Sequence, residues 1–132
     1  MSKKKINIFL VDDHQIVRDG IKSLLLDSSE ISIAGEAMNG KELMEKIEHA
    51  IPDVILMDIM MPVMDGLEAT AQIRKFEKET PSKNHTPVIA ITANTLDNDR
   101  DKCIATGMDE YMAKPFDMNR LNEIFKELNI IA

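Results

Sequence analysis

One stretch of the sequence constrains the fold more than any other. Residues 54–57 are all apolar, Pro52 precedes them, and the carboxylate of Asp58 follows them directly. A short apolar run bounded in this way is typical of a buried strand in a parallel sheet. The following loop, residues 59–66, contains proline and glycine and fits neither helical nor strand periodicity. Asp58 is therefore predicted where a strand opens into a loop, which is where open α/β sheets bind ligands.

The rest of the chain alternates strand patterns with helix patterns, without an internal repeat. Strands are predicted at residues 6–11, 31–37, 54–58, 88–92 and 111–113. Helices are predicted at residues 16–26, 40–51, 66–79, 96–106 and 118–128, the last one capped by Asp117. Such alternation predicts an α/β fold with a parallel sheet. The 132 residues suit one domain, so we expect residues 1–132 to form a single domain with no output domain.

Polar side chains stand at four of the five predicted strand ends. Asp12 and Asp13 end the first strand, Asp58 the third, Thr92 the fourth and Lys114 the fifth. The ends of parallel strands lie on one edge of the sheet, so these groups are expected to converge. Each residue alone has an ordinary explanation, since aspartate at a strand end commonly starts a turn. The coincidence of four strand ends is what predicts a site.

The charges of these groups indicate their chemistry. Three carboxylates placed close together repel one another unless a cation lies among them. Oxygen ligands of this kind suit Mg²⁺, which takes one or two protein carboxylates together with a phosphate oxygen. Mg²⁺ beside Asp58, with Lys114 opposite, would neutralise a phosphoryl group that is transferred to the Asp58 carboxylate. Asp58 is therefore the predicted nucleophile.

These residues resemble the receiver domain of two-component response regulators, and the resemblance spans most of the chain. The matching segments are residues 12–13, 57–66, 91–93 and 111–116. The resemblance implies a flavodoxin-like, doubly wound fold of five parallel strands in the order 2-1-3-4-5 with five helices. It also implies that Asp58 accepts a phosphoryl group from a phosphohistidine on a sensor histidine kinase or a histidine phosphotransfer protein. On this reading the chain is a signalling domain that assists its own phosphorylation and dephosphorylation, and not an enzyme with an external substrate.

The resemblance also assigns roles to single residues. Asp13, Asp58 and the backbone carbonyl of Met60 would hold Mg²⁺, and Asp12 would act through water. Lys114 would pair with the phosphoryl oxygens.

Two further residues would form a switch. Thr92 would bond to the phosphoryl group, and Tyr111 would then turn inward. This movement would alter the face formed by the fourth helix, the fifth strand and the fifth helix. His14, beside the acidic pair, is interpreted as a solvated residue and not as a ligand or base.

Composition excludes several classes of function. A net charge of −7, without clustered basic residues beyond the N-terminal lysines, argues against direct nucleic-acid binding. No segment has the length and apolarity of a membrane span. The single Cys103 cannot form an internal disulfide, so a reducing cytoplasm is the expected compartment. We expect a monomer, or a weak homodimer linked to phosphorylation.

Three alternative functions remain to be weighed. Aspartate-nucleophile phosphohydrolases resemble Asp-x-Asp, but the second acid is replaced here by Met60, which cannot protonate a leaving group. A dinucleotide-binding module would need a glycine-rich loop after the first strand, where this chain has acids. A pseudo-receiver that binds partners without phosphorylation stays open as the alternative.

The two halves of the chain resemble different kinds of receiver. Residues 12–20 and 34–40 look like receivers that carry a helix-turn-helix output domain. Residues 92–103 and those from 105 onward look like receivers attached to hybrid histidine kinases. The change falls near Asp58. The chain is therefore a candidate chimera of two receivers joined in the third strand or its loop, although one natural lineage could also mix these features.

Overall fold

The computed structural model describes residues 5–26, 28–47, 51–59, 61, 63–80, 85–92, 97–113, 118–128 and 130, with side chains left out for 97–100. Strands and helices alternate along this part of the chain. The strands are β1 (Ile6–Val11), β2 (Ile31–Ala37), β3 (Val54–Asp58), β4 (Val88–Thr92) and β5 (Glu110–Ala113). The helices are α1 (Gln15–Leu26), α2 (Gly40–Ile47), α3 (Gly66–Glu79), α4 (Asp97–Thr106) and α5 (Met118–Glu127). The predicted cap of α5, Asp117, lies outside the described residues.

Local signals explain several helix ends. Asp65 caps α3, because its side chain accepts a hydrogen bond of 2.8 Å from the backbone N–H of Glu68. Gly107 ends α4 with a φ of +117°, which glycine adopts without a steric penalty. The backbone N–H of Gly107 bonds to the carbonyl of Ile104, and the next N–H bonds to the carbonyl of Cys103. This pair of bonds is the Schellman arrangement that glycine favours at a helix C-terminus.

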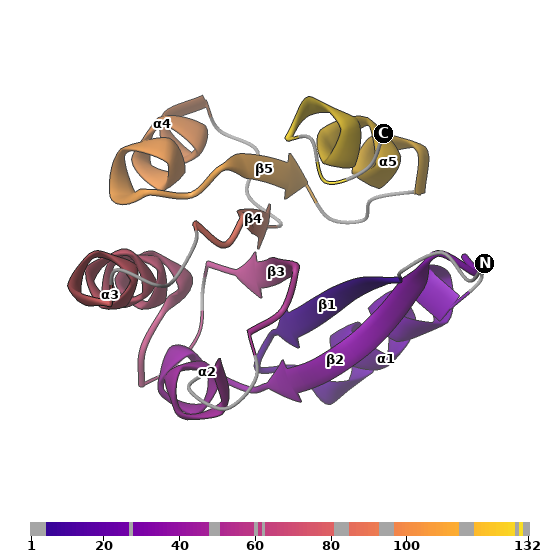
Figure 1. Cartoon of the computed structure of the whole chain (residues 1–132), viewed down its shortest axis with the longest axis horizontal. Coiled ribbons are helices and arrows are strands. Elements are labelled where there is room, and N and C mark those ends of the chain that lie inside the picture. Colours follow the sequence, from indigo (N-terminus) through magenta and orange to yellow (C-terminus); the bar gives the residue numbers. More distant parts are fainter. Residues whose placement is uncertain are drawn as a thin grey trace.

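The five strands form one parallel sheet in the order β2-β1-β3-β4-β5, which confirms the predicted flavodoxin-like topology. β3 and β4 are buried along their whole length, as expected for central strands covered on both faces. The edge strand β2 is only partly buried. In Figure 1 the sheet separates α1 and α5 on one side from α2, α3 and α4 on the other.

Alternate residues of the strands supply two apolar layers. Phe9, Ile55 and Met57 face the side of α2, α3 and α4, where the buried core includes Leu43 and Ile73. The opposite layer packs under α1 and α5, and its largest fully buried members are Ile8, Leu10, Leu25, Leu56, Ile89, Met112, Leu121 and Phe125. The sheet is thus held rigidly from both faces, and its carboxyl edge is a firm base for a site.

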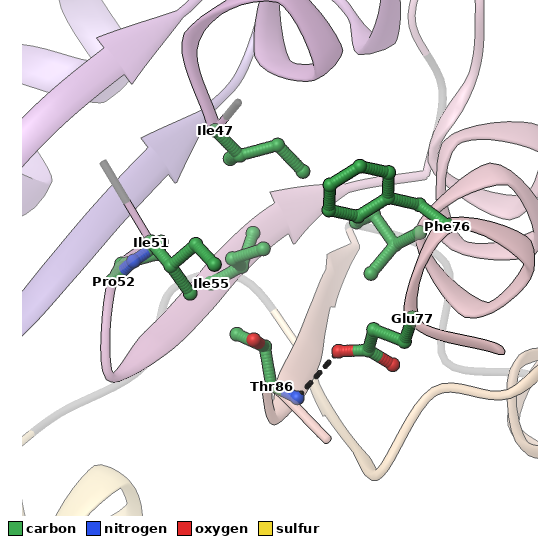
Figure 2. A pocket seen from close by; sticks show the side chains of 8 residues that line it. Ile47, Ile51, Pro52, Ile55, Phe76, Glu77 and Thr86 are labelled. Carbon is green, nitrogen blue, oxygen red and sulfur yellow. Dashed lines mark hydrogen bonds between the residues drawn. The ribbon is translucent and has the colours of Figure 1, made fainter. Parts of the chain in front are cut away.

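A small apolar hollow lies at the other end of the sheet, between α2 and α3 near the start of β3 (Figure 2). Its lining consists of Ile47, Ile51, Pro52, Ile55, Ile73, Phe76, Glu77 and Thr86. The one carboxylate there, Glu77, already accepts a 2.7 Å hydrogen bond from the backbone N–H of Thr86. The hollow therefore offers little chemistry. Within the described residues, no helix has the length and apolarity needed to cross a membrane.

Candidate functional site

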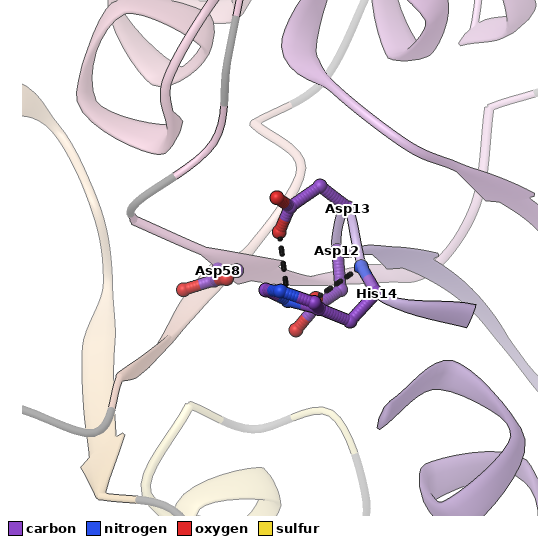
Figure 3. Close-up of side chains that lie close together, drawn as sticks. All are labelled: Asp12, Asp13, His14 and Asp58. Carbon is purple, nitrogen blue, oxygen red and sulfur yellow. Dashed lines mark hydrogen bonds and ion pairs between the residues drawn. The ribbon is translucent and has the colours of Figure 1, made fainter. Parts of the chain in front are cut away.

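Strand register brings the acids of β1 and β3 together. Val11 pairs with Met57 in the parallel β1–β3 ladder, so Asp12 and Asp58, the next residues of the two strands, leave the sheet side by side. One carboxylate oxygen from each of Asp12, Asp13 and Asp58 and one ring nitrogen of His14 lie within 4.8 Å of one another. Figure 3 shows these four side chains gathered at the carboxyl edge of the sheet. The structure thus confirms that residues 12, 13 and 58 converge.

The acidic cluster combines burial with like charge. Asp12 is 3% exposed and Asp58 is 6% exposed, while the Asp13 side chain is 24% exposed. Carboxylates at such short range repel one another strongly where water is partly excluded. The three carboxylates therefore repel one another, and a bound cation would reduce this repulsion.

One oxygen of the cluster is orphaned. Asp13 Oδ1 is buried and, among the described residues, accepts no hydrogen bond. Buried polar atoms are nearly always hydrogen-bonded, so this oxygen is available to a further positive partner in addition to the nearby ring of His14. Three carboxylates with such an oxygen fit a hard divalent cation such as Mg²⁺, which prefers oxygen ligands.

His14 lies closer to the acids than the sequence suggests. Its side chain is 68% exposed, as expected for a solvated residue. Its ring nitrogen Nδ1 nevertheless lies 3.1 Å from Asp13 Oδ1 and 3.5 Å from Asp12 Oδ1. The backbone N–H of His14 also donates a 2.9 Å hydrogen bond to Asp12 Oδ1. His14 therefore belongs to the acidic cluster, although its ring is largely exposed to solvent.

The sequence did not indicate a role for Arg18. Its side chain supports the turn that carries Asp12 and Asp13. Arg18 is only 8% exposed, and its guanidinium donates to the backbone carbonyl of Asp12, to Gln15 Oε1 at 2.6 Å and to Glu36 Oε1 at 3.1 Å. Lys22 donates to the other Glu36 oxygen at 2.9 Å. The hydrogen bond from Lys22, followed by the one from Arg18, holds the pKa of Glu36 below its usual value against the opposing effect of burial. Arg18 and Leu25 are seven positions apart and share the buried face of α1, but apolar periodicity gives no signal for a charged residue on that face.

A glycine allows α3 to approach the predicted nucleophile. A Cβ on Gly66 would lie 2.4 Å from the backbone oxygen of Asp58 and 2.9 Å from Cα of Ile59. The backbone N–H of Gly66 also donates a 2.9 Å hydrogen bond to the carbonyl of Ile59. The first turn of α3 thus packs directly on the backbone that carries Asp58, and only glycine fits there.

Of the other predicted site residues, the structure describes Thr92 and Tyr111 but not Met60 and Lys114. Thr92 is 3% exposed at the carboxyl end of β4, where its neighbour in β5 is Ala113. Tyr111 lies in β5 opposite Ala90, half-buried against the apolar layer under α2, α3 and α4. Met60 and Lys114 lie outside the described residues, so their predicted roles are not placed.

Comparison with known proteins agrees with this arrangement. Residues 8–126 match the family model of the response regulator receiver domain. The chain is 36% identical over 122 residues to the response regulator protein VraR of Staphylococcus saprophyticus, which covers 92% of this chain and 56% of that protein. The chain spans about half the length of the curated relatives it matches.

Three solved structures are similar along nearly the whole chain. The receiver domain of the sensor histidine kinase PA1611 from Pseudomonas aeruginosa, with a magnesium ion in its active site cleft, has a TM-score of 0.76 and 33% identity, covering 93% of this chain and 96% of that one. The receiver domain of Saccharomyces cerevisiae Ssk1, in complex with the histidine phosphotransfer protein Ypd1, scores 0.80 with 31% identity, covering 96% and 90%. A DNA-binding response regulator of the LuxR family from Staphylococcus aureus scores 0.78 with 27% identity, covering 94% and 98%.

The last of these corrects one expectation. The predicted absence of nucleic-acid binding is not supported, because a similar protein is a DNA-binding regulator. The charge argument concerned only the surface of these 132 residues.

The family match extends over most of the chain, and the strand order and the acid cluster agree with it. The chain belongs to the family of response regulator receiver domains.

Proposed function

We propose that the protein is a phosphoacceptor in which Asp58 receives a phosphoryl group from a phosphohistidine. The observation that carries the proposal is the convergence of Asp12, Asp13 and Asp58 at the carboxyl edge, with one Asp13 oxygen lacking a hydrogen-bond partner. Asp58 is the natural nucleophile of the three, because it ends the central strand β3 and the first turn of α3 packs closely on its backbone at Gly66. A carboxylate held this firmly meets the positioning requirement of phosphoryl transfer.

The proposed metal ligands are Asp13, Asp58 and the backbone carbonyl of Met60, with Asp12 acting through water. The orphaned Asp13 oxygen and the buried Asp58 suit such a role, whereas Met60 lies outside the described residues. Mg²⁺ bound there would neutralise charge that develops on the phosphoryl oxygens. Arg18 keeps the acidic turn in place through its bond to the Asp12 carbonyl.

The proposed reaction needs one bond to form and one to break. A carboxylate oxygen of Asp58 attacks the phosphorus atom of the phosphohistidine. The phosphorus–nitrogen bond breaks, its electron pair stays on the imidazole of the donor, and an acyl phosphate remains on Asp58. Lys114 is proposed to pair with the phosphoryl oxygens.

The proposed output is a change on the face formed by α4, β5 and α5. Thr92 would bond to the phosphoryl group, and Tyr111 would turn further inward. The proposal is supported by the position of Thr92 and Tyr111 on the neighbouring strands β4 and β5, with Tyr111 half-buried against the apolar layer.

The proposed donors are a sensor histidine kinase or a histidine phosphotransfer protein. The similar Ssk1 receiver, which forms a complex with a phosphotransfer protein, supports this assignment. We further propose a cytoplasmic location, a monomer or weak phosphorylation-linked homodimer, and no turnover of an external substrate.

Intact-mass spectrometry with acetyl phosphate as the donor tests the proposal. The wild-type chain should gain one phosphoryl group only when Mg²⁺ is present, and Asp58→Asn should gain none. Asp101→Asn is a matched control, because Asp101 is exposed on α4 and the change is chemically the same. Unchanged phosphorylation in Asp58→Asn or in excess chelator would overturn the assignment. A wild-type chain that gains nothing would favour the pseudo-receiver alternative.

The origin of the chain as a chimera of two receivers remains a hypothesis. Neither the packing nor the comparison supports it, because Leu25 of α1 and Phe125 of α5 are both fully buried in one apolar layer and a single relative matches across both halves. If the chain is a chimera, small donors should phosphorylate it normally, while the kinases of both parents should transfer poorly. Efficient transfer from one cognate kinase, or one natural gene that encodes residues 1–132, would contradict this origin.

A further inference from the structure

We propose that His14 is an additional ligand of the metal site and extends its range to transition-metal ions such as Ni²⁺ and Zn²⁺. The inference rests on the proposed function for the location of the site, but it concerns a residue to which that function assigns no role. His14 is the one nitrogen donor in the cluster that the described residues form.

The separations of the donor atoms match those of ligands on a shared ion. Metal–nitrogen and metal–oxygen bonds to such ions are about 2.0 to 2.2 Å long, so two ligands at right angles stand about 3 Å apart. Nδ1 of His14 lies 3.1 Å from Asp13 Oδ1 and 3.5 Å from Asp12 Oδ1. The shorter separation, to Asp13 Oδ1, fits adjacent positions around one ion, whereas Asp12 is proposed to act through water.

The contact of His14 with Asp13 has ion-pair distance but not hydrogen-bond alignment. Although the two atoms are 3.1 Å apart, Asp13 Oδ1 accepts no hydrogen bond from any described residue. The other described histidine provides the contrast, because His85 Nε2 and Asp109 Oδ1 form a hydrogen bond of 2.6 Å. Nδ1 of His14 and Oδ1 of Asp13 thus lie within ion-pair distance without an aligned hydrogen bond (Figure 3), and a bound metal ion would take both atoms as ligands.

The backbone of His14 is held in position before any ion arrives. Its N–H donates to Asp12 Oδ1 at 2.9 Å, and its carbonyl accepts from the N–H of Arg18 at 3.1 Å. The side chain itself is 68% exposed, so an ion can reach the ring from solvent. Figure 3 shows the ring beside the acids and not directed away from them.

The identity of the donor determines which ions benefit. Imidazole nitrogen is a preferred ligand of Ni²⁺ and Zn²⁺, whereas Mg²⁺ selects oxygen and retains water. An imidazole beside three carboxylates therefore favours transition-metal ions over Mg²⁺ more strongly than the carboxylates alone.

Isothermal titration calorimetry of the full chain with Ni²⁺, Zn²⁺ and Mg²⁺ tests the inference. The ratio of Ni²⁺ to Mg²⁺ affinity should fall by about tenfold or more in His14→Ala, as expected for loss of an imidazole ligand. His85→Ala serves as the matched control, because His85 bonds to Asp109 at the amino end of the sheet, and it should leave the ratio unchanged. Asp13→Asn should weaken the binding of all three ions.

Each outcome is decisive for His14. An unchanged affinity ratio in His14→Ala would overturn the inference, whether the individual affinities stay the same or fall together. Separate measurement of Asp58 phosphorylation distinguishes the two proposals. A ratio that depends on His14 in a chain that is never phosphorylated would leave the metal site standing and remove the proposed function. Normal phosphorylation with an unchanged affinity ratio would support the proposed function and remove His14 as a metal ligand.

Discussion

The two ends of the sheet use aspartate in opposite ways. At the amino end, Asp109 Oδ2 accepts hydrogen bonds of 2.8 Å from Arg74 and from the backbone N–H of Val88, and Oδ1 bonds to His85. At the carboxyl end, Asp13 lies beside Asp12 and Asp58, and one of its oxygens lacks a hydrogen-bond partner.

The difference separates the end that stabilises the fold from the end to which we assign the proposed chemistry. Arg74 also donates to Glu77 and to the carbonyls of Thr86 and Gly107, so it joins α3 to the segments that lead into β4 and β5. Paired charge of this kind fixes the chain. Clustered like charge at the opposite end costs stability and is retained where it serves binding or catalysis.

The largest expected effect comes from breaking the paired end. Arg74→Met should lower the free energy of unfolding by roughly 3 kcal/mol, because it removes the guanidinium that pairs with Asp109 and Glu77, both largely buried. Urea denaturation measures the loss. Arg120→Met is the control, since Arg120 and Glu123 form an exposed ion pair and should contribute less than about 1 kcal/mol. Equal losses in the two variants would contradict the comparison.

The second prediction disturbs the backbone at the carboxyl end. Gly66→Ala should cost about 2 kcal/mol and slow the phosphorylation of Asp58, because the new Cβ would lie 2.4 Å from the Asp58 carbonyl oxygen. Gly20→Ala is the matched control. Nothing lies within 4 Å of that Cβ, so it should stabilise α1 by about 0.5 to 1 kcal/mol. Denaturation together with the initial rate of phosphorylation checks both variants.

The third prediction relieves the repulsion at the carboxyl end. In excess chelator, Asp13→Asn should raise the free energy of unfolding by about 0.5 to 1 kcal/mol, because one of three clustered charges is removed. Added Mg²⁺ should stabilise the wild type by mass action and the variant much less. Thermal unfolding with and without the ion provides the measurement. A variant that is less stable than the wild type in chelator would show that the cluster is not strained.

The smallest effect concerns pH. Lys22 and Arg18 hold the pKa of Glu36 below its ordinary value of 4.5, so the folded state binds this proton less readily than the unfolded state. The stabilisation is present above pH 4.5 and is lost as the pH falls through the lowered folded-state value. Stability should therefore decline more steeply below pH 4.5 in the wild type than in Glu36→Gln. If the two proteins lose stability equally as the pH falls, Glu36 does not contribute to the pH dependence of stability.

Much of the site was predictable because its elements are local. The apolar run before Asp58 and the acids after Val11 identify strand ends, and a parallel sheet brings such ends together. The buried face of α1 follows the apolar pattern of its sequence less closely. Ile16 belongs to the apolar helical pattern but is 85% exposed, whereas Arg18 is 8% exposed. Hydrophobic periodicity cannot foresee that a charged side chain is buried when its partners, Glu36 and the Asp12 carbonyl, come from other elements.

The sequence by itself determined the order of strands and helices, the residues at the strand ends and the family, because these depend on local patterns and motifs. Only the tertiary structure decided that Asp13 lacks a hydrogen-bond partner, that His14 lies against the acids, and that Arg74 joins Asp109 across 35 positions of sequence. Such pairings depend on register and on the packing of distant segments. Two aspartates that look alike in sequence therefore acquire opposite roles, because one folds beside a cation and the other beside further acids.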